Sequence, residues 1–95
     1  MRPVMNKSQL IDAVRERCDD VPRKVVAEVV DSLLETVQDT VSEGTDVSVT
    51  GFGRFTRSER AARTGRNPQS GATINIPASR TPTFKAGKGF KDRVR

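Results

Sequence analysis

The sequence predicts an α+β fold: two N-terminal helices, a three-stranded antiparallel sheet with a long protruding β-ribbon arm, and a short C-terminal helix. Two observations predict these elements. Apolar residues recur at helical spacing up to about residue 43, and the period changes to 2 from Asp46, with six of the seven glycines at or beyond Gly51. A third observation concerns assembly: only 34% of the 95 residues are apolar, and a lone domain of this size buries only about two-thirds of its unfolded surface. We therefore expect the core to be completed by a second copy of the chain.

Residues 6–44 are expected to form the helical dimerisation part, after a flexible extension over residues 1–5. Asn6 is placed to cap a helix that begins at Lys7, and Gln9 can return the hydrogen bond. This helix should end near Cys18, with an apolar face made of Leu10, Ile11, Val14 and Cys18. Pro22 suits the first turn of a second helix, which should run to about Glu43 and end at a left-handed Gly44. Its buried stripe is predicted to be Val26, Val29, Val30, Leu33, Val37 and Val41.

Residues 46–82 are expected to form the sheet and the arm. Val47 and Val49 alternate with polar residues as in a half-buried strand, and 51–53 is a tight turn. A second strand is predicted over 54–63 and a third over 73–76, separated by turn-forming residues 67–71. Pro77 and Pro82 exclude a central strand but are tolerated at an edge or in an arm. A final helix fits 87–94.

The residue types present exclude most catalytic and metal sites. The chain has no histidine and one cysteine, Cys18, so the common zinc sites and Ser-His or Cys-His pairs cannot form within one chain. We expect no enzyme activity, no metal, no cofactor and no small-molecule substrate. No apolar run approaches the roughly 20 residues of a membrane span, and nothing near Met1 resembles a secretory leader. A single cysteine fits a reducing compartment, so a cytoplasmic protein is expected.

Charge is divided unevenly along the chain. Residues 1–50 have six Lys and Arg against ten Asp and Glu, whereas residues 51–95 have eleven against two, a balance of +9. Five arginines in the basic half recur every third residue: Arg54, Arg57, Arg60, Arg63 and Arg66. On a strand this period places arginines on both faces in turn, and a sheet that rests on a core cannot bury such a face. Residues 57–80, hereafter the arm, should therefore leave the body as a two-stranded ribbon, of which residues 57–67 alone span roughly 34 Å.

An arm of this kind needs an anionic partner that meets both of its faces. The minor groove of DNA, about 6 Å wide and walled by phosphates, has this character, although charge and spacing alone do not distinguish DNA from RNA. Pro68 is the one rigid apolar group at the tip of the arm. It either shapes the turn or acts as a wedge between base pairs.

The motifs GFGRF (51–55) and RAARTGRNPQSG (60–71) resemble the HU/IHF family of bacterial nucleoid DNA-binding proteins, closest to HU. MNKSQLIDAV (5–14) and TFKAGKGFKDRV (83–94) are similar to the same family, so the resemblance covers residues 5–95. It implies that residues 6–95 form a DNA-binding domain within an intertwined homodimer whose two arms wrap double-stranded DNA in the nucleoid. The residues it implies for the minor-groove arm are Arg57, Arg60, Arg63, Arg66, Asn67, Pro68 as the intercalating wedge, Gln69 and Arg80. Those implied for phosphates on the flank are Lys7, Lys85, Lys88 and Lys91, and those for the dimer core are Phe52, Phe55, Phe84 and Phe90.

The function expected from this resemblance is histone-like: binding, bending, wrapping and compacting DNA with little sequence specificity and a preference for bent, nicked or cruciform duplexes. Two alternatives stay open. The chain could be a sequence-specific IHF-like subunit, which would protect a discrete DNA site. It could also be an RNA-binding basic protein, which competition between duplex DNA and structured RNA would reveal.

Overall fold

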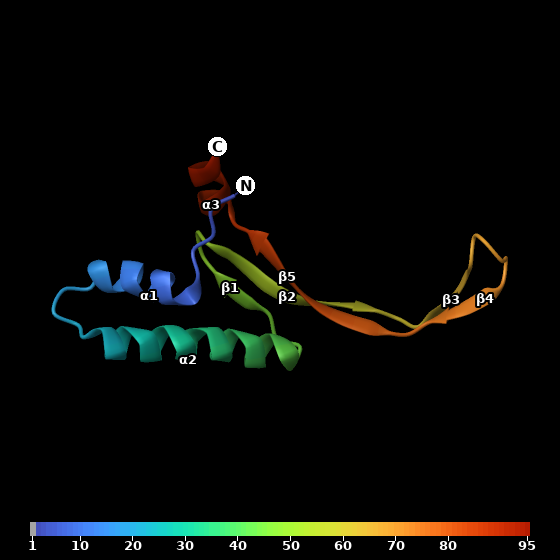
Figure 1. Cartoon of the computed structure of the whole chain (residues 1–95), viewed down its shortest axis with the longest axis horizontal. Helices are drawn as coiled ribbons and strands as arrows, with labels where there is room; N and C mark the ends of the chain where they lie inside the picture. The colour runs from blue at the N-terminus through green and yellow to red at the C-terminus, as the bar shows by residue number, and fades with distance from the viewer. Residues whose placement is uncertain (1) are drawn as a thin grey trace. The chain divides into compact units, whose positions relative to one another are not determined.

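The computed structural model describes residues 2–95, which form three helices and five strands (Figure 1). In chain order these are α1 (Lys7–Glu16), α2 (Arg23–Ser42), β1 (Val47–Val49), β2 (Gly53–Arg60), β3 (Arg63–Arg66), β4 (Thr73–Ile76), β5 (Ser79–Ala86) and α3 (Lys88–Val94). The chain divides into two compact units, one up to Gln38 and one over Asp39–Arg95. Of the extension expected over residues 1–5, Met1 lies outside the described residues, and residues 2–5 form neither helix nor strand. The α+β prediction is confirmed.

The start of α1 follows the predicted capping box. The Asn6 side chain accepts a hydrogen bond from the Gln9 amide at 2.8 Å, and the Gln9 side chain accepts one from the Asn6 amide at 2.9 Å. The helix ends at Glu16, two residues before the predicted end at Cys18. The reversal that follows needs a left-handed residue, and Asp20 adopts it with φ of 60°.

The core of the first unit is small. Ile11, Val26 and Val30 are buried, and Val14, Val21 and Ala27 pack against them. Three residues of the predicted apolar stripes are exposed within one chain: the exposed fractions of Leu10, Val29 and Leu33 are 42%, 61% and 59%. Val29 and Leu33, which were predicted to lie in the buried stripe, are thus not buried within the single chain, because two helices cover only the strip along which they meet.

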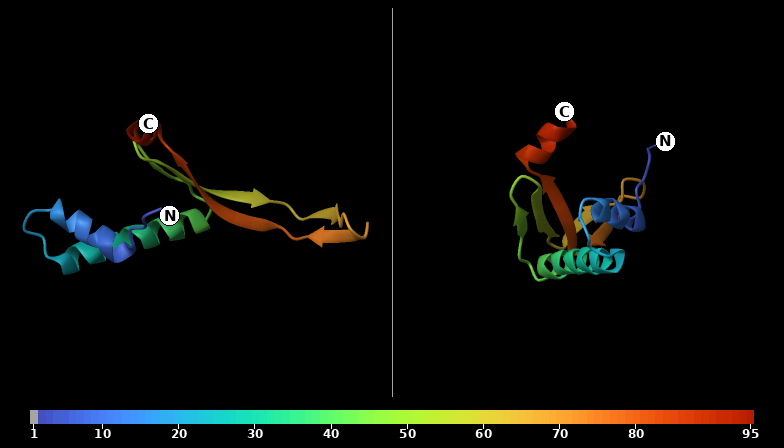
Figure 2. Two further views of the ribbon diagram at one scale, coloured as in Figure 1. Left: turned by 45° about the horizontal axis from the view of Figure 1, so that its top comes forward. Right: turned by 90° about the vertical axis from the view of Figure 1, so that its left-hand side faces the viewer.

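The second unit contains an antiparallel sheet with the strand order β1-β2-β5. The turn between β1 and β2 is tight: the Phe52 amide donates to the Val49 carbonyl at 3.0 Å, and Gly51 has φ of 80°. The third strand of this sheet is β5, not the predicted 73–76 segment. β5 extends to Ala86, beyond the expected boundary at residue 82, and Pro82 is accepted because β5 is an edge strand. Figure 2 shows β2 and β5 side by side and twisted about one another.

The predicted 73–76 strand is instead β4, which pairs only with β3 in a separate two-stranded ribbon. The register is unchanged across the break, since Arg60 is opposite Ser79 and Arg63 is opposite Ile76. The strand predicted over 54–63 is therefore interrupted at residues 61–62. The register places residue 62 opposite Pro77, which has no backbone amide to donate to a ladder hydrogen bond. In Figure 1 the β3–β4 ribbon continues beyond the β2–β5 pair and ends in a turn.

Among residues 2–95, no helix is long and apolar enough to cross a membrane.

Candidate nucleic-acid interface

One face of the β2–β5 pair carries only polar and basic side chains. Residues directly opposite in an antiparallel pair share a face, and so do alternate residues along each strand. The register therefore groups Arg54, Thr56, Ser58 and Arg60 of β2 with Lys85, Thr83, Thr81 and Ser79 of β5. We call these eight residues the polar face. The Thr56 and Thr83 hydroxyls are hydrogen-bonded at 2.6 Å, which links its two rows at the centre.

The opposite face of the same strands is aromatic near the turn. Phe55 and Phe84 are direct cross-strand partners with ring centroids 4.8 Å apart. Phe52 lies 5.3 Å from Phe84 and 5.4 Å from Phe90, so the four predicted core rings form one cluster. Phe52 and Phe84 nevertheless remain 44% and 41% exposed within one chain. The cluster therefore identifies the apolar face of the sheet, and within one chain this face is only partly covered.

Arg54 and the hydroxyl residues of the polar face were not among the site residues predicted from the sequence. The signal was present, because residues 54, 56, 58 and 60 lie at period 2 on the strand face opposite Phe55. Arg54 is not an independent cation, since its guanidinium donates to the Asp46 carboxylate at 2.8 and 3.1 Å. Lys85, by contrast, has no ion pair within residues 2–95.

The distal arginines of the arm lie on both faces of the ribbon, as the period of three predicts. Arg63 shares a face with Gly65, Ile74 and Ile76, whereas Arg66 lies on the other face with Thr64, Thr73 and Asn75. Arg60, Arg63 and Arg66 are all exposed. None of the three forms an ion pair with any described residue. Residues 60–78 contain three arginines and no acidic residue, so the positive charge of this segment has no internal compensation.

The tip of the arm closes on itself through backbone and side-chain hydrogen bonds. The Asn67 amide donates to the Ala72 carbonyl at 2.8 Å, and the Gly71 amide donates to the Asn67 carbonyl at 2.7 Å. The Asn67 side chain accepts from the Gln69 amide at 2.9 Å, which forms an Asx turn. Pro68 takes part in none of these bonds and is exposed. The turn therefore presents the proline ring outward on a framework built by its neighbours.

Arg57 and Arg80 differ from the distal arginines because each has an acidic partner. The Arg57 guanidinium donates to the Ser42 carbonyl at 2.7 Å and to the Glu59 carboxylate at 2.5 Å, and its side chain is only 23% exposed. Arg80 lies 3.8 Å from the same carboxylate and is 70% exposed. Arg57 was predicted to line the arm, but its guanidinium group contacts the C-terminal end of α2.

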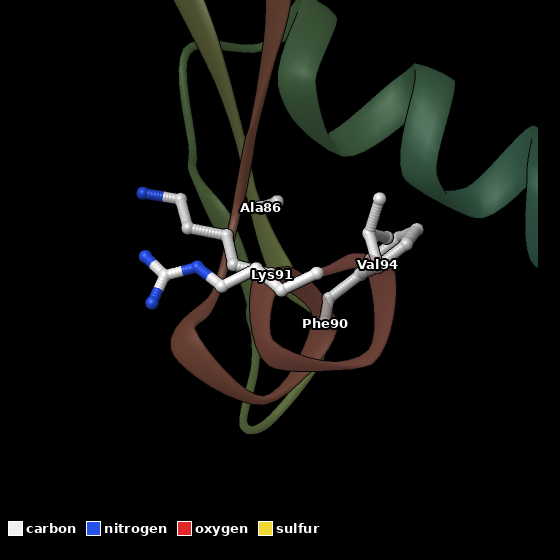
Figure 3. Close-up of a pocket in the computed structure, with 5 residues that line it drawn as sticks. Ala86, Phe90, Lys91 and Val94 are labelled. Carbon is white, nitrogen blue, oxygen red and sulfur yellow. The ribbon is translucent and has the colours of Figure 1, made fainter.

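The predicted flank lysines also divide into two groups. Lys88 and Lys91 are exposed on α3 and have no ion pair within residues 2–95. Figure 3 shows the Lys91 amine pointing away from Phe90 and Val94. Lys7, in the first unit, is 2.9 Å from Asp31, and the hydrogen bond to that carboxylate raises the pKa of Lys7 above its ordinary value.

Within the part of the chain that the structure describes, no group of histidine, cysteine or acidic side chains could hold a metal ion. The polar groups that the site presents are mainly guanidinium groups, ammonium groups and hydroxyls, with the amide side chains of Asn67 and Gln69 at the tip. Such donors bind phosphate oxygens, and guanidinium groups also reach base edges. This chemistry is that of nucleic-acid binding.

Comparison with known proteins gives a consistent picture. Residues 5–95 match the family described as bacterial DNA-binding protein. The chain is 50% identical over 91 residues to the DNA-binding protein HU of Staphylococcus aureus, covering 96% of this chain and all of the relative. It is 47% identical over 90 residues to HU-beta of Escherichia coli, covering 95% and 99%. Among solved structures, an Anabaena HU–DNA cocrystal structure superposes with a TM-score of 0.79 and 46% identity over 95% of this chain and 97% of that one. HU from Thermotoga maritima gives a TM-score of 0.66 at 28% identity, over 96% and 100%.

Proposed function

The chain belongs to the bacterial DNA-binding protein family, and from that premise we propose that it is an HU-like, histone-like architectural protein. It binds double-stranded DNA in the minor groove with little sequence specificity, and bends, wraps and compacts it. It acts by binding rather than by catalysis, in the cytoplasm at the nucleoid. The observation that carries the proposal is the arm, whose Arg60, Arg63 and Arg66 are exposed on both faces without an acidic partner among the described residues.

The arm enters the minor groove because its charge distribution fits that groove. Arginines that alternate between the two faces of a ribbon meet the phosphates on both walls, which are about 6 Å apart. Minor-groove edges distinguish mainly A·T from G·C pairs, so readout there is degenerate. Binding is consequently governed by the shape and deformability of the duplex. Asn67, Gln69 and Arg80 complete the set of minor-groove residues.

Pro68 acts as the intercalating wedge. Its ring is exposed at the tip, while the turn is closed by Asn67, Gly71 and Ala72. An apolar side chain inserted at a base step unstacks it at a cost of a few kcal/mol and kinks the duplex. DNA that is already nicked or bent avoids part of this cost, so it binds more tightly.

The polar face and the α3 lysines bind the phosphates that flank the arm. Threonine and serine hydroxyls donate to phosphate oxygens, and Lys85, Lys88 and Lys91 add charge without sequence selectivity. If about 6–10 phosphates are neutralised per dimer, the logarithm of the affinity falls against the logarithm of the salt concentration with a slope of about −5 to −9. Lys7 joins this set only on a longer duplex that displaces Asp31.

The protein functions as an intertwined homodimer. One chain leaves many large apolar side chains exposed on both units: Leu10, Val25, Val29, Leu33, Leu34, Val49, Phe52, Phe84 and Val94. Figure 3 shows Ala86, Phe90 and Val94 lining a hollow beside α3. Burying apolar area stabilises by roughly 25 cal/mol per Å². A second copy, which carries the same surfaces, covers them symmetrically.

A competition experiment tests the proposed function. Affinity is measured over a salt series for linear, nicked and cruciform duplexes of random sequence and for a structured RNA, with the mass of the protein determined on the same sample. We expect a dimer that prefers nicked and cruciform DNA over linear DNA and over RNA. Equal or tighter binding of RNA would contradict the proposal, and protection of one discrete site in footprinting would favour a sequence-specific subunit instead.

A further inference from the structure

Three charged residues meet where the arm leaves the sheet: Arg57, Glu59 and Arg80. They share one face of the sheet, because Arg57 and Glu59 are two residues apart along β2 and Glu59 is directly opposite Arg80 on β5. One carboxylate oxygen of Glu59 accepts the bond from Arg57 and lies 3.8 Å from Arg80. We call these residues the arm-base cluster. It contains two cations and one anion.

Arg57 is held in place by the protein itself. Its guanidinium donates to the Ser42 carbonyl, one of the carbonyls that the last turn of α2 leaves without an intrahelical partner. A Cβ atom at Gly44, which has φ of 94°, would lie 3.1 Å from the Arg57 guanidinium, so the chain reversal after α2 also contacts this group. The positive charge is favourable at the negative end of the helix dipole. These contacts leave little of Arg57 for an external phosphate.

Arg80 is held much more loosely. Its separation from Glu59 exceeds hydrogen-bond distance, and its side chain is largely exposed. An exposed ion pair of this kind contributes little and is easily exchanged for another anion. Arg80 is therefore the member of the cluster that a phosphate can recruit, in competition with the Glu59 carboxylate.

We propose that Glu59 is a positioning residue that sets the affinity of the arm base for DNA, by holding Arg57 against α2 and by competing with a DNA phosphate for Arg80. This inference rests on the proposed DNA-binding function. Among the arginines of the arm, it assigns the proximal limit of strong minor-groove contact to Arg60, and Arg80 contributes fully only when the negative charge of Glu59 is removed. Glu59 is one of only two acidic residues in 51–95, which makes its effect on the local field large.

The substitution Glu59→Gln separates these two effects. The glutamine side chain retains an oxygen that accepts the Arg57 hydrogen bond, so the anchor at α2 stays in place. The negative charge disappears, and with it the competition for Arg80. The matched control is Glu43→Gln, which removes the same charge from an exposed carboxylate with no ion pair among the described residues.

The readout is the affinity of the intact dimer for a nicked duplex over a salt series. We expect Glu59→Gln to bind about threefold to tenfold more tightly than the wild type at low salt. If each protomer then binds one additional phosphate, the logarithmic salt slope should steepen by up to about two per dimer. Glu43→Gln should follow the wild type closely, and the double variant Glu59→Gln/Arg80→Gln should bind no more tightly than the wild type. A purely structural role for Glu59 would change the melting temperature and not the salt slope.

Two outcomes would overturn the inference. The first is a Glu59→Gln variant that binds no more tightly than Glu43→Gln. The second applies if Glu59→Gln does not fold: Arg80→Gln alone should then cost less affinity than Arg63→Gln, and an equal cost would contradict the assigned competition. Failure of the wild type to bind duplex DNA would instead refute the proposed function itself, which keeps the two failures distinct.

Discussion

Replacing Pro68 with alanine isolates the wedge from the turn that presents it. Proline has no amide, and the bonds that close the tip run between Asn67, Ala72 and Gly71 and from the Gln69 amide to the Asn67 side chain. Pro68→Ala removes the rigid ring and leaves all of these bonds in place. We therefore expect an arm of unchanged structure with a smaller apolar group at its end.

The expected magnitude follows from two wedges per dimer. Each inserted apolar side chain kinks a duplex by roughly 20–90°, so losing both should lower the total bend by at least about 40°. The arginines that supply most of the affinity are untouched, and the unstacking cost is no longer incurred. Affinity should consequently fall much less than the bend, and the preference for nicked over intact duplex should shrink.

Fluorescence energy transfer between the ends of a short duplex measures this bend at saturating protein. Ser70→Ala is the control, because it removes the hydroxyl that accepts from the Ala72 amide at 3.2 Å and so perturbs the turn without changing the wedge. We expect the control to bend DNA as the wild type does. A bend that is unchanged in Pro68→Ala, or reduced equally in both variants, would refute the assignment of Pro68 as a wedge.

Further substitutions test other parts of the site. Arg63→Gln should make the logarithmic salt slope shallower by about two per dimer, since each protomer then neutralises one phosphate fewer, and it should not alter the melting temperature. An unchanged slope in the same titration would contradict the contact of Arg63 with DNA. Leu33 is 59% exposed in one chain, so in a monomer Leu33→Lys would change the free energy of unfolding by no more than about 0.5 kcal/mol. In the proposed dimer we expect the substitution to cause dissociation, which sedimentation measures. A dimer that stays stable would contradict the interface. Arg57→Gln should lower the free energy of unfolding by about 1–2 kcal/mol in urea titrations and leave the salt slope unchanged, because its bonds are internal. Asp31→Asn should lower the raised pKa of Lys7 toward its ordinary value in an NMR titration, with the smaller effect of Glu35 remaining. Because the folded pKa is the higher one, the stabilisation by the Lys7–Asp31 pair is present below the unfolded pKa of about 10.4 and is lost as the pH rises through the folded value. Wild type and variant should therefore converge in stability at higher pH.

Local signals predicted the elements of this chain well. Asn6 and Gln9 specify a helix start through their own side chains, and Gly44 and Gly51 adopt the positive φ that their turns require. The change of period at Asp46 marks the boundary between helix and strand correctly. Each of these features depends on a few neighbouring residues, which is why the sequence reveals them.

Pairing between distant segments was predicted less well. The 73–76 segment has an alternating pattern, yet it pairs with β3 in the ribbon, while the proline-containing 79–86 segment completes the sheet. Alternation identifies a strand but not its partner, because register depends on contacts across the whole sheet. The period of three likewise placed arginines on both faces but did not reveal that Arg57 points toward the end of α2. That position depends on the Ser42 carbonyl and Glu59, of which the first lies fifteen residues away.

The buried stripes illustrate a different limit. Val29 and Leu33 follow the helical pattern of core residues and are exposed in one chain. A helical pattern of apolar residues indicates that a side chain will be buried. It does not indicate whether the same chain or a second copy buries it. The proposed homodimer accounts for this difference without any change to the helix assignment.

Methylation protection tests most directly whether the arm lies in the minor groove. Dimethyl sulfate reacts with adenine N3 on the minor-groove edge and with guanine N7 on the major-groove edge, so one nicked duplex reports on both grooves. With saturating protein we predict protection of adenine N3 over the segment spanned by the two arms, with guanine N7 remaining reactive. Protection of guanine N7 while adenine N3 stays reactive would contradict the account.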